Sequence, residues 1–175
     1  PIPYIEIAKT YTQQGQFFAA SVNAEKALSL DKENAHTYGQ LGIIFIRARN
    51  YEGAMPLLRC AVRGCTAEEN EMGGVAVEGL DLTSLSIAYY YVEYGTVQAF
   101  LSRERENYCY PPLGDAMQVL QEVRERYSHD PILTAIVEDS EGICRRLGGP
   151  GGSSAEGTST PSPSETPEMQ AADSN

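Results

Sequence analysis

The sequence predicts an all-α protein: an α-solenoid of helical hairpins with a C-terminal closing helix and a disordered tail. Residues 35–68 repeat residues 1–34 without a gap. Apolar residues recur at helical spacing in both copies, and a self-similarity of about 34 residues is the period of a helix-turn-helix repeat. Nine aligned positions carry similar residues in the same order: Tyr4 and Tyr38, Ile7 and Leu41, Ala8 and Gly42, Tyr11 and Phe45, Phe17 and Tyr51, Ala20 and Ala54, Ala24 and Leu58, Ala27 and Ala61, and Leu28 and Val62.

Each copy divides into two predicted helices joined by a turn, which Gln14-Gly15 supplies in the first copy. The apolar stripe of its first helix consists of Tyr4, Ile7, Ala8 and Tyr11, and that of its second helix consists of Phe17, Ala20, Ala24, Ala27 and Leu28. Small residues recur within both copies, namely Ala8, Ala20, Gly42 and Ala54. We expect them to let the paired helices approach closely. Pro56 interrupts one backbone hydrogen bond of the second copy and is expected to bend that helix slightly.

A third hairpin is predicted over residues 82–130, after a linker at 69–81. Its first helix spans about 82–102, because Ile87, Ala88, Tyr91 and Gly95 reproduce the offsets of the first copy. Residues 103–112 form an insertion. A second apolar stripe then follows, at Ala116, Leu120, Val123 and Tyr127.

Residues 131–147 are predicted as a closing helix, since Asp130-Pro131 combines a capping carboxylate with a proline suited to the first turn. Its apolar side is expected to hold Ile132, Ile136, Ile143, Cys144 and Leu147. The charged residues Glu138, Asp139, Glu141 and Arg145 are expected largely on the other sides of the helix. Such a helix covers the last repeat of a solenoid. The N-terminal side shows no matching cap, so we expect further repeats before Pro1. Residues 148–175 are rich in Gly, Ser, Thr and Pro and are predicted to be disordered.

These spacings resemble the tetratricopeptide repeat (TPR) family, clearly over residues 1–68 and more weakly over 82–147. Lys32 stands where the family usually has proline. The resemblance implies a concave groove, lined by the first helix of each hairpin, that binds a peptide or protein. Carried onto this chain, the groove positions are Ile2, Ile5, Glu6, Lys9, Thr12 and Gln13; then His36, Gly39, Gln40, Ile43, Ile46 and Arg47; and then Leu85, Ser86, Tyr89, Val92 and Glu93.

The resemblance implies a non-catalytic scaffold for protein–protein interaction. The alternative is a non-catalytic arm of a larger enzyme, such as a glycosyltransferase, kinase or peptidase, with its catalytic domain upstream. A branch of the family binds chaperone C-termini through fixed Lys and Asn residues. Here Ile5 and Lys9 stand where Lys and Asn are expected, and Gln40 replaces a second Asn. That specificity is therefore not carried over, although Lys9 and Arg47 are suited to attract an acidic ligand.

Four tyrosines, Tyr89, Tyr90, Tyr91 and Tyr94, cover several faces of the third predicted hairpin's first helix. Because they cannot all face one core, we expect most of them to pack and one or two to remain for ligand contact.

Charge and hydropathy limit the classes of partner. The 175 residues hold 13 Lys and Arg against 24 Asp and Glu, a formal charge of -11. This sign disfavours nucleic acid as a partner, because phosphate is also negative. No apolar run reaches the roughly 20 residues that cross a bilayer, so no direct membrane insertion is expected. Self-association through the N-terminal repeat face stays open.

No catalytic, cofactor or metal site is predicted. The consecutive Ser128-His129-Asp130 cannot converge on one reacting atom. The four cysteines lack metal-ligand spacing, and we expect small buried side chains in a reducing compartment. Cytoplasmic localisation is favoured, and export or membrane attachment through an upstream segment is the alternative. Export would permit disulfides in any of three pairings.

Overall fold

A computed structural model describes residues 2–149 of the chain. It confirms the all-α fold class: within these residues, seven helices account for the secondary structure, apart from an isolated antiparallel β-bridge between Cys65 and Val77. The helices are α1 (Ile2–Gln13), α2 (Phe17–Leu30), α3 (Ala35–Arg47), α4 (Tyr51–Arg63), α5 (Leu85–Ser102), α6 (Ala116–Arg126) and α7 (Pro131–Leu147). The predicted disordered tail lies outside the described residues, except for Gly148 and Gly149.

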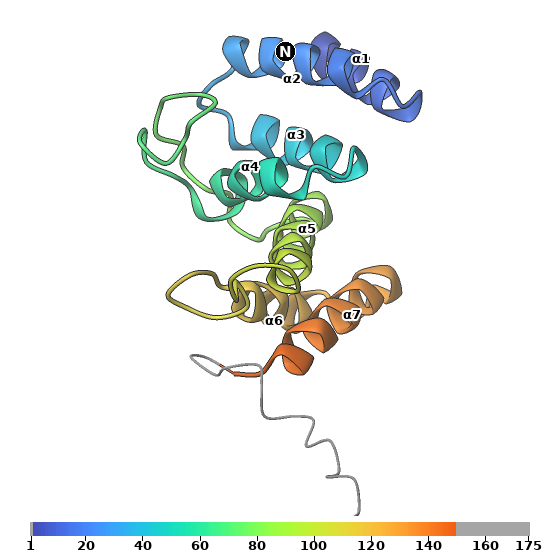
Figure 1. The fold of residues 1–175 in the computed structure, drawn as a ribbon, viewed down its shortest axis with the longest axis vertical. Helices are drawn as coiled ribbons and strands as arrows, with labels where there is room; N and C mark the ends of the chain where they lie inside the picture. Colours follow the sequence, from blue (N-terminus) through green and yellow to red (C-terminus); the bar gives the residue numbers. More distant parts are fainter. Residues whose placement is uncertain (1, 150–175) are drawn as a thin grey trace, which may run out of the picture.

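The helices form successive layers, from α1 and α2 at one end to α6 and α7 at the other (Figure 1). Helix α1 packs on α2, and α3 packs on α4. Helix α5 packs against α4 on one side and against α6 and α7 on the other, so it joins the two halves. This order is compatible with a solenoid. None of the described helices combines the length and the apolar character needed to cross a membrane.

Small residues sit at the contacts within the hairpins, as the repeat predicts. Ala8, Ala20 and Ala54 are at most 2% exposed. At Gly42, an added Cβ would lie 2.5 Å from the Cγ of Leu58, a buried residue of α4. Because real Cβ atoms essentially never approach other atoms so closely, α3 and α4 pack as they do only with glycine at this position.

Polar side chains define where several helices begin. Asn34 accepts a hydrogen bond from the His36 N–H at the start of α3, and Asn50 accepts one from the Gly53 N–H at the start of α4. Asp130 accepts from the backbone N–H groups of Ile132 and Leu133, at 3.0 and 2.9 Å. These bonds satisfy donors that a helix leaves free at its first turn. The predicted start of α7 at Pro131 is confirmed.

The apolar face of α7 differs from the predicted one. Ile132 is 62% exposed, and the buried residues are Leu133, Val137, Ser140, Glu141, Ile143 and Cys144. Glu141, expected on the polar side, is only 4% exposed. Its carboxylate accepts two hydrogen bonds from Arg124 of α6, at 3.0 and 3.1 Å, and one from Arg145 at 2.7 Å. Two guanidinium partners compensate the burial of this charge, which the sequence pattern alone does not reveal.

Two further apolar predictions are wrong in the first hairpin. Ile7 and Phe17 are 41% and 45% exposed, whereas their counterparts one repeat later, Leu41 and Tyr51, are buried and half-buried. The third hairpin matches its predicted spacing more closely, since Ile87, Ala88, Tyr91 and Gly95 are all buried in α5. That helix begins at Leu85, because Ser84 caps it by accepting from the Ile87 N–H.

The cysteines form disulfides, which corrects the expectation of free buried thiols. Cys60 is bonded to Cys65, and Cys109 is bonded to Cys144. The second bond ties the loop between α5 and α6 to α7, across a sequence separation of 35 residues. Closing such a loop restricts the unfolded chain and stabilises the folded one. Disulfides of this kind persist in oxidising environments and fit poorly with the expected reducing compartment.

The segment between α4 and α5 is an ordered loop held by its own hydrogen bonds. Asn70 is 3% exposed and donates to the Tyr38 hydroxyl and to the Val75 carbonyl, both at 2.8 Å. The Leu80 N–H donates to the Ala61 carbonyl at 2.8 Å. These bonds fix the loop against α3 and α4, and thereby fix the path by which the chain enters α5.

The contact at Gly42 yields a test of the hairpin packing. Gly42→Ala is expected to destabilise the protein by about 1–3 kcal/mol, because the clash with Leu58 exceeds the gain of about 1 kcal/mol in helix propensity. Gly142→Ala in α7 is the matched control: its Cβ would meet only Arg146 Nη1, at 3.4 Å. We expect this control to be neutral or stabilising in urea unfolding. Equal effects of the two substitutions would contradict the packing described.

Candidate functional site

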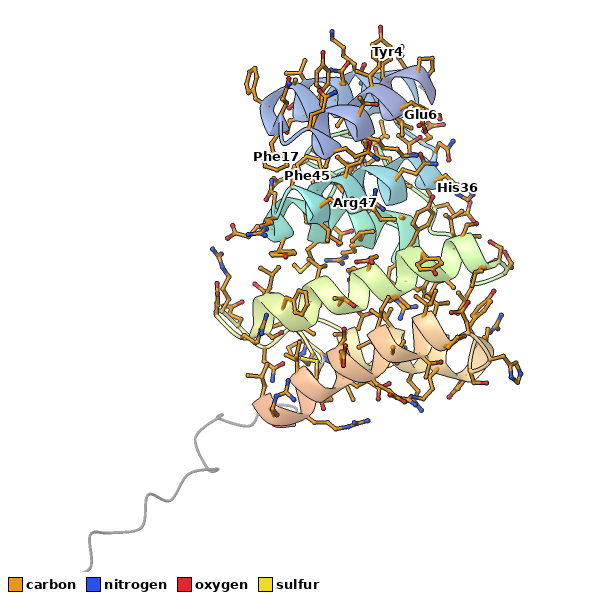
Figure 2. All side chains as sticks on the ribbon, turned by 90° about the vertical axis from the view of Figure 1, so that its right-hand side faces the viewer. Tyr4, Glu6, Phe17, His36, Phe45 and Arg47 are labelled. Atoms are coloured by element: carbon orange, nitrogen blue, oxygen red, sulfur yellow. A yellow bond between two sulfur atoms is a disulfide. The ribbon has the colours of Figure 1, made fainter. Side chains whose placement is uncertain are left out.

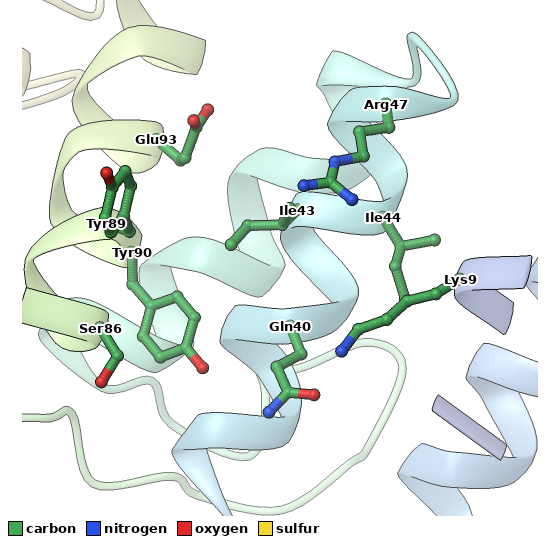
Figure 3. A pocket seen from close by; sticks show the side chains of 9 residues that line it. All are labelled: Lys9, Gln40, Ile43, Ile44, Arg47, Ser86, Tyr89, Tyr90 and Glu93. Atoms are coloured by element: carbon green, nitrogen blue, oxygen red, sulfur yellow. The ribbon is translucent and has the colours of Figure 1, made fainter. Parts of the chain in front are cut away.

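A pocket of about 500 Å³ lies along α3, between α1 on one side and α5 on the other (Figure 3). We refer to it as the α1–α3–α5 pocket. The first helices of three successive hairpins thus each contribute to one cavity. It is lined by Lys9 from α1; Gln40, Ile43, Ile44 and Arg47 from α3; and Ser86, Tyr89, Tyr90 and Glu93 from α5.

The two main walls are held together at Gly39 and Tyr90. A Cβ on Gly39 would lie 2.8 Å from three ring carbons of Tyr90, so α3 approaches α5 closely at this point. The Tyr90 ring also meets the His36 ring edge to face, with centroids 5.9 Å apart. Tyr90 is only 5% exposed. It therefore serves both as a packing contact between two hairpins and as part of the pocket wall.

The floor of the pocket is apolar and partly aromatic. Ile44 is 3% exposed, while Ile43 and Tyr89 are half-buried and leave part of their surface open to a ligand. In Figure 3 the side chain of Ile43 extends from α3 toward Tyr89 and Tyr90 on α5. Apolar surface that stays partly open gains free energy when a ligand covers it.

Charged groups stand around this floor. Arg47 is exposed on α3, and Lys9 Nζ lies 2.9 Å from Glu6 Oε1, within the same helix. Glu93 faces them from α5. Burial raises the pKa of Glu93 above its usual value, and the positive charge of Arg47 opposes that rise. The pocket thus combines two cations with one partly desolvated carboxylate, in a chain that is otherwise strongly acidic.

The structure brings together seven of the seventeen groove positions that the TPR resemblance implies. Lys9, Gln40, Ile43, Arg47 and Tyr89 all line the α1–α3–α5 pocket. Ser86 and Glu93, which the resemblance also implies, line it as well.

The prediction is wrong for two residues of α1. Ile5 is 4% exposed and belongs to the buried cluster that contains Tyr38 and Leu41. Thr12 is 8% exposed, and its hydroxyl donates to the Ala8 carbonyl at 2.8 Å. Both side chains therefore serve packing rather than the open surface.

Three other candidates lie outside the pocket. Glu6 and Gln13 are exposed on α1, and Glu6 acts on the pocket only through its ion pair with Lys9. His36 is exposed on α3 and contacts the pocket only through the Tyr90 ring. Sequence reasoning missed Ile44 and Tyr90, since buried residues at helical spacing are normally assigned to the core. The one feature of the sequence that could have indicated Tyr90 is the glycine at position 39, because a glycine within a helix often marks the close approach of another element.

The tyrosines of α5 divide as their spacing predicts. Tyr90, Tyr91 and Tyr94 are each 5% exposed, and the Tyr91 hydroxyl donates to the Leu80 carbonyl at 2.6 Å. Tyr89 is half-buried, with part of its ring open to the pocket. Packing therefore uses three of them, of which Tyr90 also lines the pocket wall, and Tyr89 is the one that keeps an open ring at the candidate site.

The residues considered for catalysis have structural roles or stand apart. Asp130 uses its carboxylate to cap α7, and its neighbours Ser128 and His129 are exposed. Within residues 2–149, no group of three or more His, Cys, Asp or Glu side chains is arranged to hold a metal ion.

Comparison of the chain with models of protein families, with curated proteins and with solved structures gives no match. The interpretation of the pocket therefore rests on its own residues and geometry.

The environment of Glu93 predicts how stability depends on pH. Its raised pKa means that the folded protein binds this proton more tightly than the unfolded chain, so the ionised carboxylate reduces stability at neutral pH. Glu93→Gln is expected to raise the free energy of unfolding at pH 7. The gain should vanish at about pH 3.5, where the carboxyl is protonated in both states. Urea unfolding at the two pH values measures both effects.

The exposed Glu25 on α2 supplies the control. Glu25→Gln should change stability little at either pH. A Glu93→Gln variant that is less stable than the native chain at pH 7 would show that Glu93 is held by favourable charge pairing instead.

Proposed function

We propose that the chain is a non-catalytic, TPR-like binding module that holds a segment of a partner protein in the α1–α3–α5 pocket. The observation that carries this proposal is the convergence of three successive first helices on one partly apolar cavity. The family resemblance of the sequence leads to the same surface. The internal repeat and the pocket are thus two separate lines of support.

The size and lining of the pocket favour a peptide segment with an anchoring side chain. A volume of about 500 Å³ lies within the range of sites that enclose a small ligand or a few side chains. Ile43 and Tyr89 offer apolar and aromatic surface, of the kind that dominates the energetics of protein interfaces. Gln40 and Ser86 add polar groups able to fix the orientation of a bound backbone.

Charge favours a neutral or acidic segment over a basic one at this site. Arg47 and Lys9 stand at the pocket, but Lys9 is already paired with Glu6 at 2.9 Å, so Arg47, which faces Glu93, is the cation most available to a ligand. Elsewhere the chain is acidic, with a formal charge of -11. An acidic ligand is therefore attracted by the pocket but repelled by the remaining surface, so we expect weak long-range steering and specificity that depends on close contacts.

Peptides selected for binding to the chain test this proposal. A random displayed peptide library is first selected on the immobilised native chain. The selected peptides are then synthesised, and their affinity for the chain is measured by fluorescence anisotropy. Ile43→Glu and Arg47→Glu are each expected to weaken binding by about tenfold or more, because they change the floor and the charge of the pocket.

Arg146→Glu is the matched control, since Arg146 is exposed on α7 and distant in the fold from the pocket. It should leave the affinity within about twofold. Circular dichroism verifies that all three variants remain helical. Peptides whose affinity is unchanged by Ile43→Glu and by Arg47→Glu would overturn the proposal, and so would a library that yields no binder.

A further inference from the structure

The two disulfides of the chain, whose sulfur atoms are yellow in Figure 2, differ in their access to reagents in solution. Cys109 and Cys144 are both 0% exposed and belong to a buried cluster of side chains from α5, α6 and α7. Cys60 is 2% exposed, but its partner Cys65 lies in the loop after α4 and is only half-buried. Because a thiol must reach one sulfur atom of a disulfide to attack it, the Cys60–Cys65 bond is the more accessible of the two.

A hollow of about 350 Å³ lies beside this bond, between α4 and the loop that follows it. Its walls include Pro56, Leu57 and Cys60 from α4, and Glu69, Asn70 and Met72 from the loop. Such a volume is large enough to hold a small thiol reagent. The Cys109–Cys144 bond has no comparable hollow among those found in the described residues.

Backbone hydrogen bonds hold the loop in place independently of the disulfide. The Cys65 N–H donates to the Val77 carbonyl and the Val77 N–H donates to the Cys65 carbonyl, both at 2.9 Å. The Leu80 N–H donates to the Ala61 carbonyl at 2.8 Å. Opening the Cys60–Cys65 bond therefore leaves these contacts, and the path of the chain into α5, in place.

The two disulfides also differ in how much they restrict the unfolded chain. Cys60 and Cys65 are separated by 5 residues, whereas Cys109 and Cys144 are separated by 35. Because the entropy lost on closing a loop grows with its length, the shorter link contributes less to the folding equilibrium constant, by a factor of about twenty. The chain thus depends less on the Cys60–Cys65 bond than on the buried one.

We propose that the Cys60–Cys65 disulfide is a site of selective reduction, which a dithiol reductant opens while Cys109–Cys144 stays closed and the chain stays folded. One thiolate of the reductant attacks the Cys65 sulfur, the disulfide bond breaks, and Cys60 leaves as a thiolate. The second thiolate of the reductant then closes a cyclic disulfide within the reductant and releases Cys65. Two electrons pass to the cysteines, which take up the two protons that the reductant gives to water.

Reduction is expected to loosen the segment between Cys65 and Val77. Asn70, five residues after Cys65, donates to the Tyr38 hydroxyl at 2.8 Å, and that hydroxyl donates to the Lys32 carbonyl at 2.6 Å. The segment is thereby joined to α3 and to the turn before it. Once the covalent anchor at Cys65 is open, we expect these bonds to break more often. This inference goes beyond the proposed function and does not depend on it, because the α1–α3–α5 pocket has none of these residues in its lining.

Timed alkylation of the native chain tests the proposal. The folded chain is treated with dithiothreitol, samples are quenched with excess N-ethylmaleimide, and peptide mass spectrometry locates the modified cysteines. Cys60 and Cys65 are expected to be modified at least about tenfold faster than Cys109 and Cys144, while circular dichroism shows that the chain remains helical. Equal rates for the two bonds, as global unfolding would give, or earlier opening of Cys109–Cys144, would overturn the proposal.

Two double variants distinguish a bond that opens in the folded chain from a bond that the fold requires. Cys60→Ser/Cys65→Ser is expected to stay folded, and the matched control Cys109→Ser/Cys144→Ser should lower the folding equilibrium constant about twentyfold further in urea unfolding. In hydrogen exchange of the first variant, the Gly73 amide, which donates to Asn70 Oδ1, should exchange about tenfold faster, and the Leu80 amide should be unchanged. An unfolded Cys60→Ser/Cys65→Ser chain, a reversed order of stability, or an unchanged Gly73 amide would each contradict the proposal.

Discussion

The contact between α3 and α5 at Gly39 and Tyr90 is the constraint on which the rest of the structure depends. A helical hairpin cannot bury its apolar face alone, so each hairpin needs a neighbour. Helix α5 supplies that neighbour to the second hairpin, formed by α3 and α4, and at the same time packs against α6 and α7. Because glycine stands at position 39, the Tyr90 ring lies directly against α3. Without this approach the α1–α3–α5 pocket would lose one of its walls.

Stability and proposed binding use neighbouring sides of the same helices. On α3, Leu41 is fully buried and supports the packing of the first hairpin, while Ile43 and Arg47 remain open toward the pocket. On α5, the Tyr91 hydroxyl donates a hydrogen bond to Leu80 in the loop before the helix, whereas the Tyr89 side chain is half-buried and part of its ring stays accessible. The same helices thus present an open, shaped surface beside their packed sides, and the described part of the chain holds no group of three or more His, Cys, Asp or Glu side chains arranged to bind a metal ion. The loop between α4 and α5 supports this arrangement, because its hydrogen bonds to Tyr38 of α3 and Ala61 of α4 fix where the chain enters α5.

Local features of the fold were predictable from the sequence, and features that depend on distant residues were not. The helix start at Asp130-Pro131 follows from capping chemistry, and the close packing at Gly42 follows from the repeat. The burial of Glu141 depends on Arg124 from another helix. The disulfide partners likewise meet only once the chain has folded, because one pair is separated by 35 residues. Seven groove positions line the pocket, but Ile5 is buried in the core, so positions carried over from a resemblance do not by themselves decide which side chains stay exposed.

The most direct test of this account is an NMR measurement of the contact between Gly39 and Tyr90. In a uniformly labelled sample, the account predicts strong nuclear Overhauser effects between the Gly39 Hα protons and the Tyr90 ring protons. It also predicts ring-current shifts of the Gly39 Hα resonances, because the ring lies against this glycine. Random-coil shifts at Gly39, without any Overhauser effect to Tyr90, would show that α3 and α5 do not meet. The stack and the α1–α3–α5 pocket would then both be contradicted.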